Sequence, residues 1–310
     1  MAKMSAEDYG TTTTHPADFD QFWDKIIDAA RAIPLDAQVE PIPQRSTEQV
    51  EVFEVTYTSL DHVRIALWYC LPRHRQGPLP AIIQVPGYVS EPLMPKATAA
   101  KGYAALSVAP RGKLRSNRQF NPGYPGLLTH NITDRNSYSY RGFYVDACRA
   151  VDFLLSRPEV DAARIGITGS SQGGALTIVT SALRPEIACA AAGAPYLCGF
   201  MDAARLTHSY PYQEINDYLR LYPEREDQVR QTLDYFDGIN FAPRIHCPII
   251  VNVGLRDDVC PPETGFALFR EIGSSNKKLY PYENCMHDAG SHWHAAITDE
   301  FLKAHLHPGE

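Results

Sequence analysis

The chain has 310 residues, of which 44% are hydrophobic and 21% charged, and its formal net charge at pH 7 is −7. These values are typical of an ordinary globular protein that is large enough to bury a substantial core. The acidic charge and the lack of a basic run argue against nucleic acid as a partner, and no stretch reaches the ~20 apolar residues needed to cross a membrane.

The first predicted element is a helix in the stretch PADFDQFWDKIIDAARAIP, residues 16–34. Its apolar residues recur every three or four positions, so they line one helix face that packs on the body of the protein. Asp18 is a suitable N-cap and Pro34 a suitable stop. The residues before this helix lack the apolar core of a signal peptide. We therefore expect a cytoplasmic location and an N-terminal extension of about residues 1–50.

Strand-forming runs come next. EVFEVTYTSL and VRIALWYCLP are rich in β-branched and aromatic residues, and they predict two antiparallel edge strands. Short continuous apolar runs follow, as in parallel strands buried on both faces, at residues 81–87, 104–110, 164–169, 188–195 and 248–254. Helical patterns between these runs, at 144–158, 173–185 and 263–273, predict an α/β fold with right-handed crossovers.

Residues 199–244 interrupt this alternation of strands and helices. The segment is rich in tyrosine and charge, and it predicts a helical insertion over one end of the sheet. Its tyrosines either line a binding cleft or form the packed face of helices, and the sequence does not distinguish the two. We expect residues 1–310 to form a single domain that includes this insertion.

The stretch RIGITGSSQGGAL places a glycine-rich turn between a predicted strand and a predicted helix. Gly169 to Gly173 match G-x-S-x-G, a motif that gains meaning in this strand–turn–helix context. The motif indicates a sharp turn that holds Ser171 in a strained conformation at the carboxyl end of the sheet. We interpret Ser171, and not Ser170, as the exposed serine and as a nucleophile.

A serine hydroxyl needs a base to become a nucleophile. Where a serine stands in a G-x-S-x-G turn of this kind, its catalytic partners follow it in the chain, first the acid and then the histidine. Asp257 and Asp258 both follow a predicted buried strand, and His287 follows the run KLYPYE. The histidines of a nearby H-x-H pair, His292 and His294, are expected at the start of the last helix. No third ligand stands at a suitable spacing, so we do not expect this pair to bind a metal.

An oxyanion hole needs two N–H donors. The residue after the nucleophile, Gln172, supplies one backbone N–H, and the loop after the strand AIIQVPG supplies the other. Tyr88 stands in that loop, and we expect it to contribute its N–H and to contact substrate. Chemistry of this kind requires no cofactor.

The seven cysteines are scattered, odd in number and without a C-x-x-C pair. This pattern is typical of reduced thiols in a cytoplasmic protein, and it does not indicate a disulfide framework or a zinc site.

The sequence resembles the acetyl xylan esterase and cephalosporin-C deacetylase family of the α/β-hydrolase fold, over nearly the whole chain. The resemblance rests on PADFDQFW, on YRGFYVDACRAVDFLLSRPEVDAARIGITGSSQGGAL and on VGLRDDVCPP. The last segment is similar to the family's acid segment GLxDxxCPP, which assigns the acid to Asp257. Three family patterns differ here: R-G-Q is Arg111-Gly112-Lys113, H-E is His287-Asp288, and THNI stands where T-R-G-I is expected. We expect Arg111 to tie neighbouring loops together.

The resemblance implies a serine esterase that removes acetyl groups from sugars or from cephalosporin C with Ser171, His287 and Asp257. It also implies a homo-oligomer, commonly a hexamer, and a small-molecule ester as substrate. Another α/β-hydrolase activity, such as that of a thioesterase, lactonase or peptidase, is an alternative. A non-catalytic binding module is a further alternative, although all three members of the triad are present.

Overall fold

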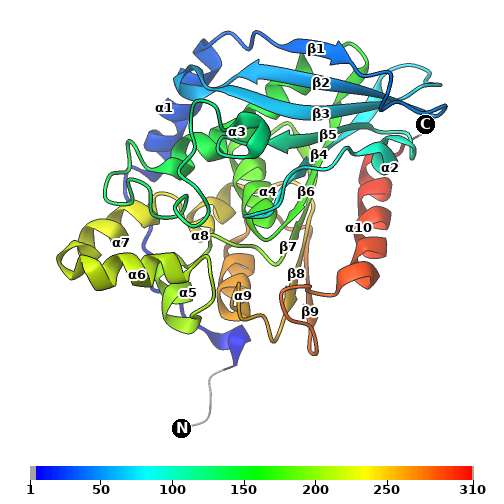
Figure 1. The fold of residues 1–310 in the computed structure, drawn as a ribbon. Coiled ribbons are helices and arrows are strands. Elements are labelled where there is room, and N and C mark those ends of the chain that lie inside the picture. The colour runs from blue at the N-terminus through cyan, green and yellow to red at the C-terminus, as the bar shows by residue number, and fades with distance from the viewer. Residues whose placement is uncertain (1–4, 309–310) are drawn as a thin grey trace.

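The computed structural model describes residues 5–308 and is organised around one continuous sheet (Figure 1). The strand order is β1-β2-β3-β5-β4-β6-β7-β8-β9. Strands β1, β2, β3 and β5 pair antiparallel, and the pairs from β5 through β4 to β9 are parallel. The predicted α/β class with a mostly parallel sheet is confirmed.

The N-terminal strands are β1 (Gln38–Pro41), β2 (Val50–Thr58) and β3 (Arg64–Pro72). The predicted antiparallel pairing of β2 with β3 is confirmed. Their predicted position at the edge is wrong, because β1 pairs outside β2 and β5 pairs with β3. The sequence did not indicate β1, since this strand is four residues long and almost entirely exposed.

The remaining strands are β4 (Leu79–Val85), β5 (Ala104–Ala109), β6 (Val160–Ser170), β7 (Ile187–Gly193), β8 (Ile249–Gly254) and β9 (Lys277–Tyr282). All predicted buried runs form strands within a few residues of their expected bounds. Every residue of β5 and of β8 is buried, as expected for strands covered on both faces. Because β4 to β9 run parallel, the loops at their carboxyl ends meet at one edge of the sheet.

Helices cover both faces of the sheet (Figure 1). One face carries α1 (Phe19–Ala32), α3 (Ser139–Leu155), α4 (Gln172–Leu183) and α9 (Pro262–Glu271). The other face carries α2 (Lys96–Ala99) and α10 (Ser291–Leu306). Short 3₁₀ helices lie at Ala6–Asp8, Leu60–His62, Leu114–Ser116, Pro223–Arg225 and Ala242–Arg244.

Helix α1 buries the apolar face that its periodicity predicted. Phe19 and Trp23 are fully buried, and the Trp23 indole donates a hydrogen bond to the carbonyl of Tyr235, at 2.7 Å. Asp18 stands at the N-cap but makes no capping hydrogen bond with its side chain. Its carboxylate instead accepts hydrogen bonds from Arg135 and from the Tyr235 hydroxyl.

Four helices lie between β7 and β8, in the segment 199–244: α5 (Phe200–Leu206), α6 (Gln213–Leu221), α7 (Glu226–Asp234) and α8 (Gly238–Phe241). The N-terminal arm, residues 11–14, is hydrogen bonded to this segment through threonine side chains. Thr12 donates to Asp202 at 2.6 Å, and Thr14 donates to Asp234 at 2.5 Å. The segment is thus tied to a part of the chain far away in sequence.

Arg111 makes a buried ion pair with Asp146 of α3. Arg111 is 4% exposed and Asp146 fully buried, and Nε and Nη2 of the arginine each lie 2.9 Å from a carboxylate oxygen. Nη2 also donates to the carbonyl of Leu60. The expectation that Arg111 ties loops together is confirmed.

We expect Asp146→Asn to lower the free energy of unfolding by about 3–5 kcal/mol, because it leaves a buried guanidinium without its counter-charge. Asp61 is the matched control: it lies 3.6 Å from the same arginine, but its side chain is 51% exposed. Asp61→Asn should cost less than about 1 kcal/mol. Urea titrations followed by circular dichroism measure both values, and equal losses would contradict the assignment.

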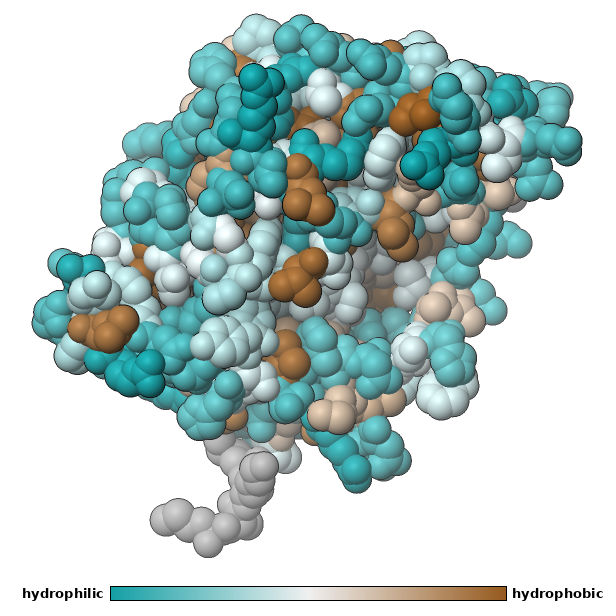
Figure 2. Space-filling view, viewed as in Figure 1, coloured by the Kyte–Doolittle hydropathy of each residue, from teal (hydrophilic) through white to brown (hydrophobic). Residues whose placement is uncertain are grey.

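The surface that Figure 2 shows is mostly hydrophilic, with hydrophobic residues dispersed over it. All seven cysteines are free, in agreement with the expectation of reduced thiols. None of the helices in the described residues is both long enough and apolar enough to span a membrane.

Candidate active site

Ser171 stands at the turn between β6 and α4 in a strained backbone conformation, with φ of 60° and ψ of −121°. Such values are rare for a residue with a side chain and persist only when the surroundings impose them. Here the Ser171 N–H donates to Gly193 at 2.9 Å, and the Ser171 carbonyl accepts from Tyr196 at 3.1 Å. The predicted strained turn is therefore confirmed.

Gly173 allows this turn to pack against the neighbouring strand. A Cβ atom at Gly173 would lie 2.3 Å from the carbonyl oxygen of Val85 in β4. Because no side chain fits there, α4 and β4 approach closely only with glycine at this position. This close approach places the N-terminus of α4 beside the loop that follows β4.

The expectation that Ser171 is the exposed serine of the pair is wrong. Ser170 is exposed, whereas Ser171 is half-buried. Ser170 is the last residue of β6, where the strand reaches the surface, whereas Ser171 lies in the turn between β6 and α4. Both serines line a cavity of about 550 Å³, so the strained backbone, and not exposure, distinguishes Ser171.

His287 and Asp257 are hydrogen bonded to each other. Nδ1 of His287 lies 2.8 Å from Oδ2 of Asp257. The other carboxylate oxygen of Asp257 accepts the N–H groups of Val259 and Cys260, at 2.8 and 2.9 Å. The Asp257 side chain is 1% exposed and that of His287 is 32% exposed. A buried acid thus orients a histidine whose ring borders the same cavity as Ser171.

The neighbouring Asp258 points elsewhere. It is exposed, and its backbone carbonyl, not its carboxylate, accepts a hydrogen bond from Thr207. The structure therefore brings Asp257 to His287 and leaves Asp258 in solvent.

The acid and histidine loops meet because Gly254 ends β8. A Cβ atom there would lie 1.9 Å from the carbonyl oxygen of Met286, so only glycine permits this approach. Beyond Gly254, the Arg256 N–H donates to the carbonyl of Cys285 at 3.0 Å. This contact joins the loop that carries Asp257 to the loop that carries His287.

Ser171 lies beside the buried thiol of Cys260, within hydrogen-bonding reach. The structure records no hydrogen bond between the Ser171 and His287 side chains, as is common in hydrolases without bound substrate. Burial raises the pKa of the Cys260 thiol well above its usual value, and the nearby Asp257 charge raises it further. Cys260 is therefore a neutral thiol at physiological pH.

Asp257, Cys260 and His287 also resemble a metal-binding set, since one ligand atom from each lies within 4.8 Å of the others. Zinc binds the thiolate form of cysteine, which burial disfavours here. Both carboxylate oxygens already accept hydrogen bonds. The set therefore suits an acid–histidine pair better than a metal.

The histidines of the H-x-H pair, His292 and His294, lie in the first turn of α10, as expected. Nδ1 of His294 lies 3.0 Å from the Tyr282 hydroxyl. The His294 side chain is buried. Burial lowers its pKa to about 4, so the ring is neutral at physiological pH.

The N–H groups of Tyr88 and Gln172 have no hydrogen-bond acceptor among the described residues. Gln172 is the first residue of α4, where N–H groups have no partner within the helix. Its side chain points into the core and donates to the Tyr140 hydroxyl at 2.8 Å. The side chain of Gln172 is therefore paired, whereas its backbone N–H has no partner among the described residues.

Tyr88 lines the cavity, and its side chain is held in place. The Tyr88 hydroxyl donates to the Glu214 carboxylate at 2.6 Å and accepts from the Leu128 N–H at 3.3 Å. The Tyr88 ring packs edge-on against Tyr124, with centroids 4.8 Å apart. The sequence did not indicate Glu214, because it lies on α6, more than a hundred residues from Tyr88.

The tyrosines of the segment 199–244 divide between the two roles that the sequence left open. Tyr210 is 56% exposed and lines the cavity beside Pro211. Tyr212 is fully buried and packs against Tyr196, with centroids 4.6 Å apart. The insertion thus supplies both a wall of the cavity and part of the core.

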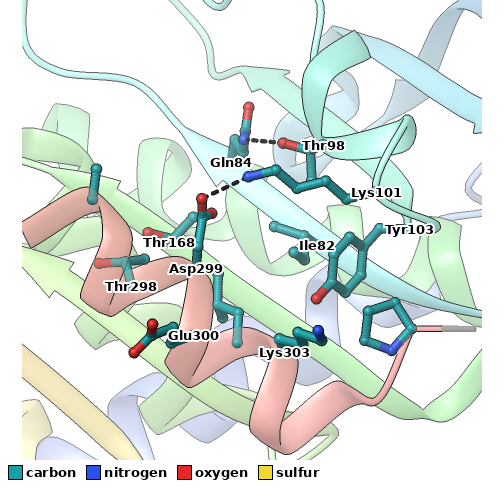
Figure 3. Close-up of a pocket in the computed structure, with 13 residues that line it drawn as sticks. Ile82, Gln84, Thr98, Lys101, Tyr103, Thr168, Thr298, Asp299, Glu300 and Lys303 are labelled. Carbon is teal, nitrogen blue, oxygen red and sulfur yellow. Dashed lines mark hydrogen bonds and ion pairs between the residues drawn. The ribbon is translucent and has the colours of Figure 1, made fainter. Parts of the chain in front are cut away.

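A second cavity, of about 630 Å³, lies between α10 and the strands β4 and β6, and Figure 3 shows its lining. Its Lys101 and Asp299 form an ion pair at 2.6 Å, and Gln84 donates to Thr98 at 2.9 Å. It shares no lining residue with the cavity at Ser171. It brings together no serine, base and acid.

Comparison with protein families gives a match over residues 2–305 to the model described as "Acetyl xylan esterase (AXE1)". Among curated proteins, the chain is similar to the acetyl esterase Axe7A of Xylanibacter ruminicola, with 28% identity over 93% of this chain. The chain spans 66% of the length of that relative.

Two solved structures are similar over almost their entire length. The acetyl xylan esterase from Paenibacillus sp. R4 is 35% identical, with a TM-score of 0.91, over 97% of this chain and 98% of that one. Acetyl xylan esterase 1 from Thermoanaerobacterium sp. JW/SL YS485 is 28% identical, with a TM-score of 0.87, over 96% and 97%. The fold described above is that of α/β-hydrolase esterases.

Proposed function

The chain belongs to the acetyl xylan esterase family, and from this premise we propose that it hydrolyses acetyl esters of small alcohols with Ser171, His287 and Asp257. The proposed substrates are acetylated xylo-oligosaccharides and cephalosporin C. The observation that carries the proposal is the hydrogen-bonded Asp257–His287 pair beside a strained serine on one cavity.

In the proposed reaction, Nε2 of His287 takes the proton of the Ser171 hydroxyl as Oγ attacks the ester carbonyl. Asp257 holds the ring through Nδ1 and stabilises the imidazolium that forms. The tetrahedral intermediate collapses, and His287 gives its proton to the departing alcohol. Water then attacks the acetyl-enzyme with His287 again as the base, which releases acetate and restores Ser171.

The negative charge on the carbonyl oxygen forms between two backbone donors, the N–H groups of Tyr88 and Gln172. Within residues 5–308 neither group has another acceptor, and the second stands at the N-terminus of α4, where the helix dipole favours negative charge. In comparable enzymes each oxyanion donor contributes about 3 kcal/mol to transition-state stabilisation. Their availability supports the proposed oxyanion hole.

The wall beside these donors supports a preference for short acyl chains. The Tyr88 hydroxyl donates to Glu214 and the Tyr88 ring packs against Tyr124, so moving the ring would break both contacts. The Glu214 carboxylate that accepts the Tyr88 hydroxyl also accepts the Gly126 N–H, at 2.8 Å. A long acyl chain would have to distort this network or remain in water.

We expect kcat/KM to fall at least about 100-fold from p-nitrophenyl acetate to the octanoate, since each refused methylene costs about 1–3 kcal/mol. A second assay tests which alcohol the enzyme accepts. It measures acetate release from acetylated xylo-oligosaccharides and from cephalosporin C, with Ser171→Ala as the background. A rise in kcat/KM toward octanoate would instead indicate a lipase-like or thioesterase-like site.

The family resemblance also supports proposals about the whole protein. We propose a homo-oligomer, a cytoplasmic location and a single domain that includes the N-terminal extension and the segment 199–244.

A further inference from the structure

Lys113 is a fully buried lysine that reaches the loop after β4. Its ammonium donates hydrogen bonds to the carbonyl oxygens of Gly87 and Tyr88, at 2.8 and 2.5 Å. These two residues border the cavity at Ser171.

The surroundings of the ammonium contain little to neutralise it. Among the described residues the hydrogen bonds of the Lys113 ammonium go to backbone carbonyls, and none goes to a carboxylate. Glu91 is the acid whose charge acts on it, and the Tyr124 ring lies 4.7 Å from Nζ. The direct contacts of the ammonium are therefore two loop carbonyls and an aromatic face.

The geometry of the Gly87–Tyr88 peptide relates the carbonyl that contacts Lys113 to the N–H on the other side of the same peptide group. In a trans peptide the C=O and the next N–H point in opposite directions, and the cis bonds of the described chain lie elsewhere, before Pro125 and Pro211. Because the Gly87 carbonyl points at Lys113, the Tyr88 N–H points away from it. A charged donor on the carbonyl also polarises the amide and strengthens its N–H as a donor.

We propose that Lys113 is a positioning residue for the oxyanion hole: its ammonium fixes the Gly87–Tyr88 peptide so that the Tyr88 N–H faces the reacting carbonyl, and its charge strengthens that donor. This inference rests on the proposed function of Ser171. It assigns Lys113 no contact with substrate, so its effect falls on the transition state and not on substrate binding.

The proposal has a consequence for the pH profile. Burial lowers the pKa of Lys113 to about 8. Below that pH the lysine is charged and the donor is strong. Above it the neutral amine still holds the carbonyls but no longer polarises them. We therefore expect kcat to fall on the alkaline side, near pH 8.

The test compares Lys113→Gln and Lys113→Met with the control Lys101→Gln, which alters a lysine remote from the site. Initial rates with p-nitrophenyl acetate, corrected for spontaneous hydrolysis, are measured from about pH 6 to about pH 10. Lys113→Gln should lower kcat about tenfold near neutral pH, and Lys113→Met up to about 100-fold, since losing a whole oxyanion donor costs about 10²–10³. Both should keep KM within about twofold and lose the alkaline decline.

Lys101→Gln should keep the wild-type profile. The inference is wrong if Lys113→Gln retains both the wild-type kcat and the alkaline decline. A wild-type kcat that stays flat over the whole range from about pH 6 to about pH 10 would overturn the role of the charge. The second outcome needs no variant, so it holds even if Lys113→Met does not fold. Failure of the proposed function gives a different result, namely activity that survives Ser171→Ala.

Discussion

Replacing Ser171 with alanine is expected to lower kcat by a factor of about 10⁴ or more while the protein stays folded, because the attacking oxygen is lost. The backbone hydrogen bonds that hold the strained turn do not involve the side chain, so circular dichroism should remain unchanged. His287→Ala should cause a loss of similar size. Steady-state hydrolysis of p-nitrophenyl acetate measures both.

The chain offers a matched control for this experiment. Ser170 is adjacent to Ser171, more exposed, and borders the same cavity, so Ser170→Ala should keep kcat within a few fold. The double variant Ser171→Ala/His287→Ala should lose little more than either single variant, because the members of a triad act as a unit. Near-normal activity of a folded Ser171→Ala protein, or additive losses, would overturn the assignment.

The second large effect is expected at Asp257. Asp257→Asn should lower kcat by about 10⁴, because the amide cannot stabilise the imidazolium and favours the wrong tautomer of His287. The neighbouring residue is the control. Asp258→Asn removes an exposed charge that does not reach His287, and we expect kcat/KM to change by no more than a few fold.

These two variants differ by a single position, so they test the loop geometry directly. The hydrogen bonds from Val259 and Cys260 to Asp257 hold its carboxylate in the turn, and Asp257→Asn retains the shape of that side chain. Equal losses in the two variants, or the larger loss at Asp258, would show that the acid has been assigned wrongly.

The parts of the fold that could be predicted are those with a strong local pattern. Strands β5 and β8, buried along their whole length, read as continuous apolar runs, and α1 shows one apolar face. Strand β1 has no such pattern, because it is short and exposed. The prediction that β2 and β3 lie at the edge was wrong for the same reason, because the undetected strand β1 pairs with the outer side of β2.

The same distinction holds for the candidate site. Ser171, Asp257 and His287 each follow a recognisable strand, so order and spacing predicted them together. The contacts of Tyr88 with Glu214 and of Lys113 with the Gly87 carbonyl join segments that are distant in sequence. No local pattern indicates such contacts. The relative exposure of Ser170 and Ser171 was also beyond prediction, since it depends on where β6 ends.

The central claim, that Ser171 is the nucleophile, is tested most directly by covalent labelling with a fluorophosphonate. This reagent reacts with serine hydroxyls that a neighbouring base activates. The account predicts one label per chain in the intact mass, located on Ser171 by peptide mapping, and none in His287→Ala. A label on Ser170, or an active enzyme that takes up no label, would contradict it.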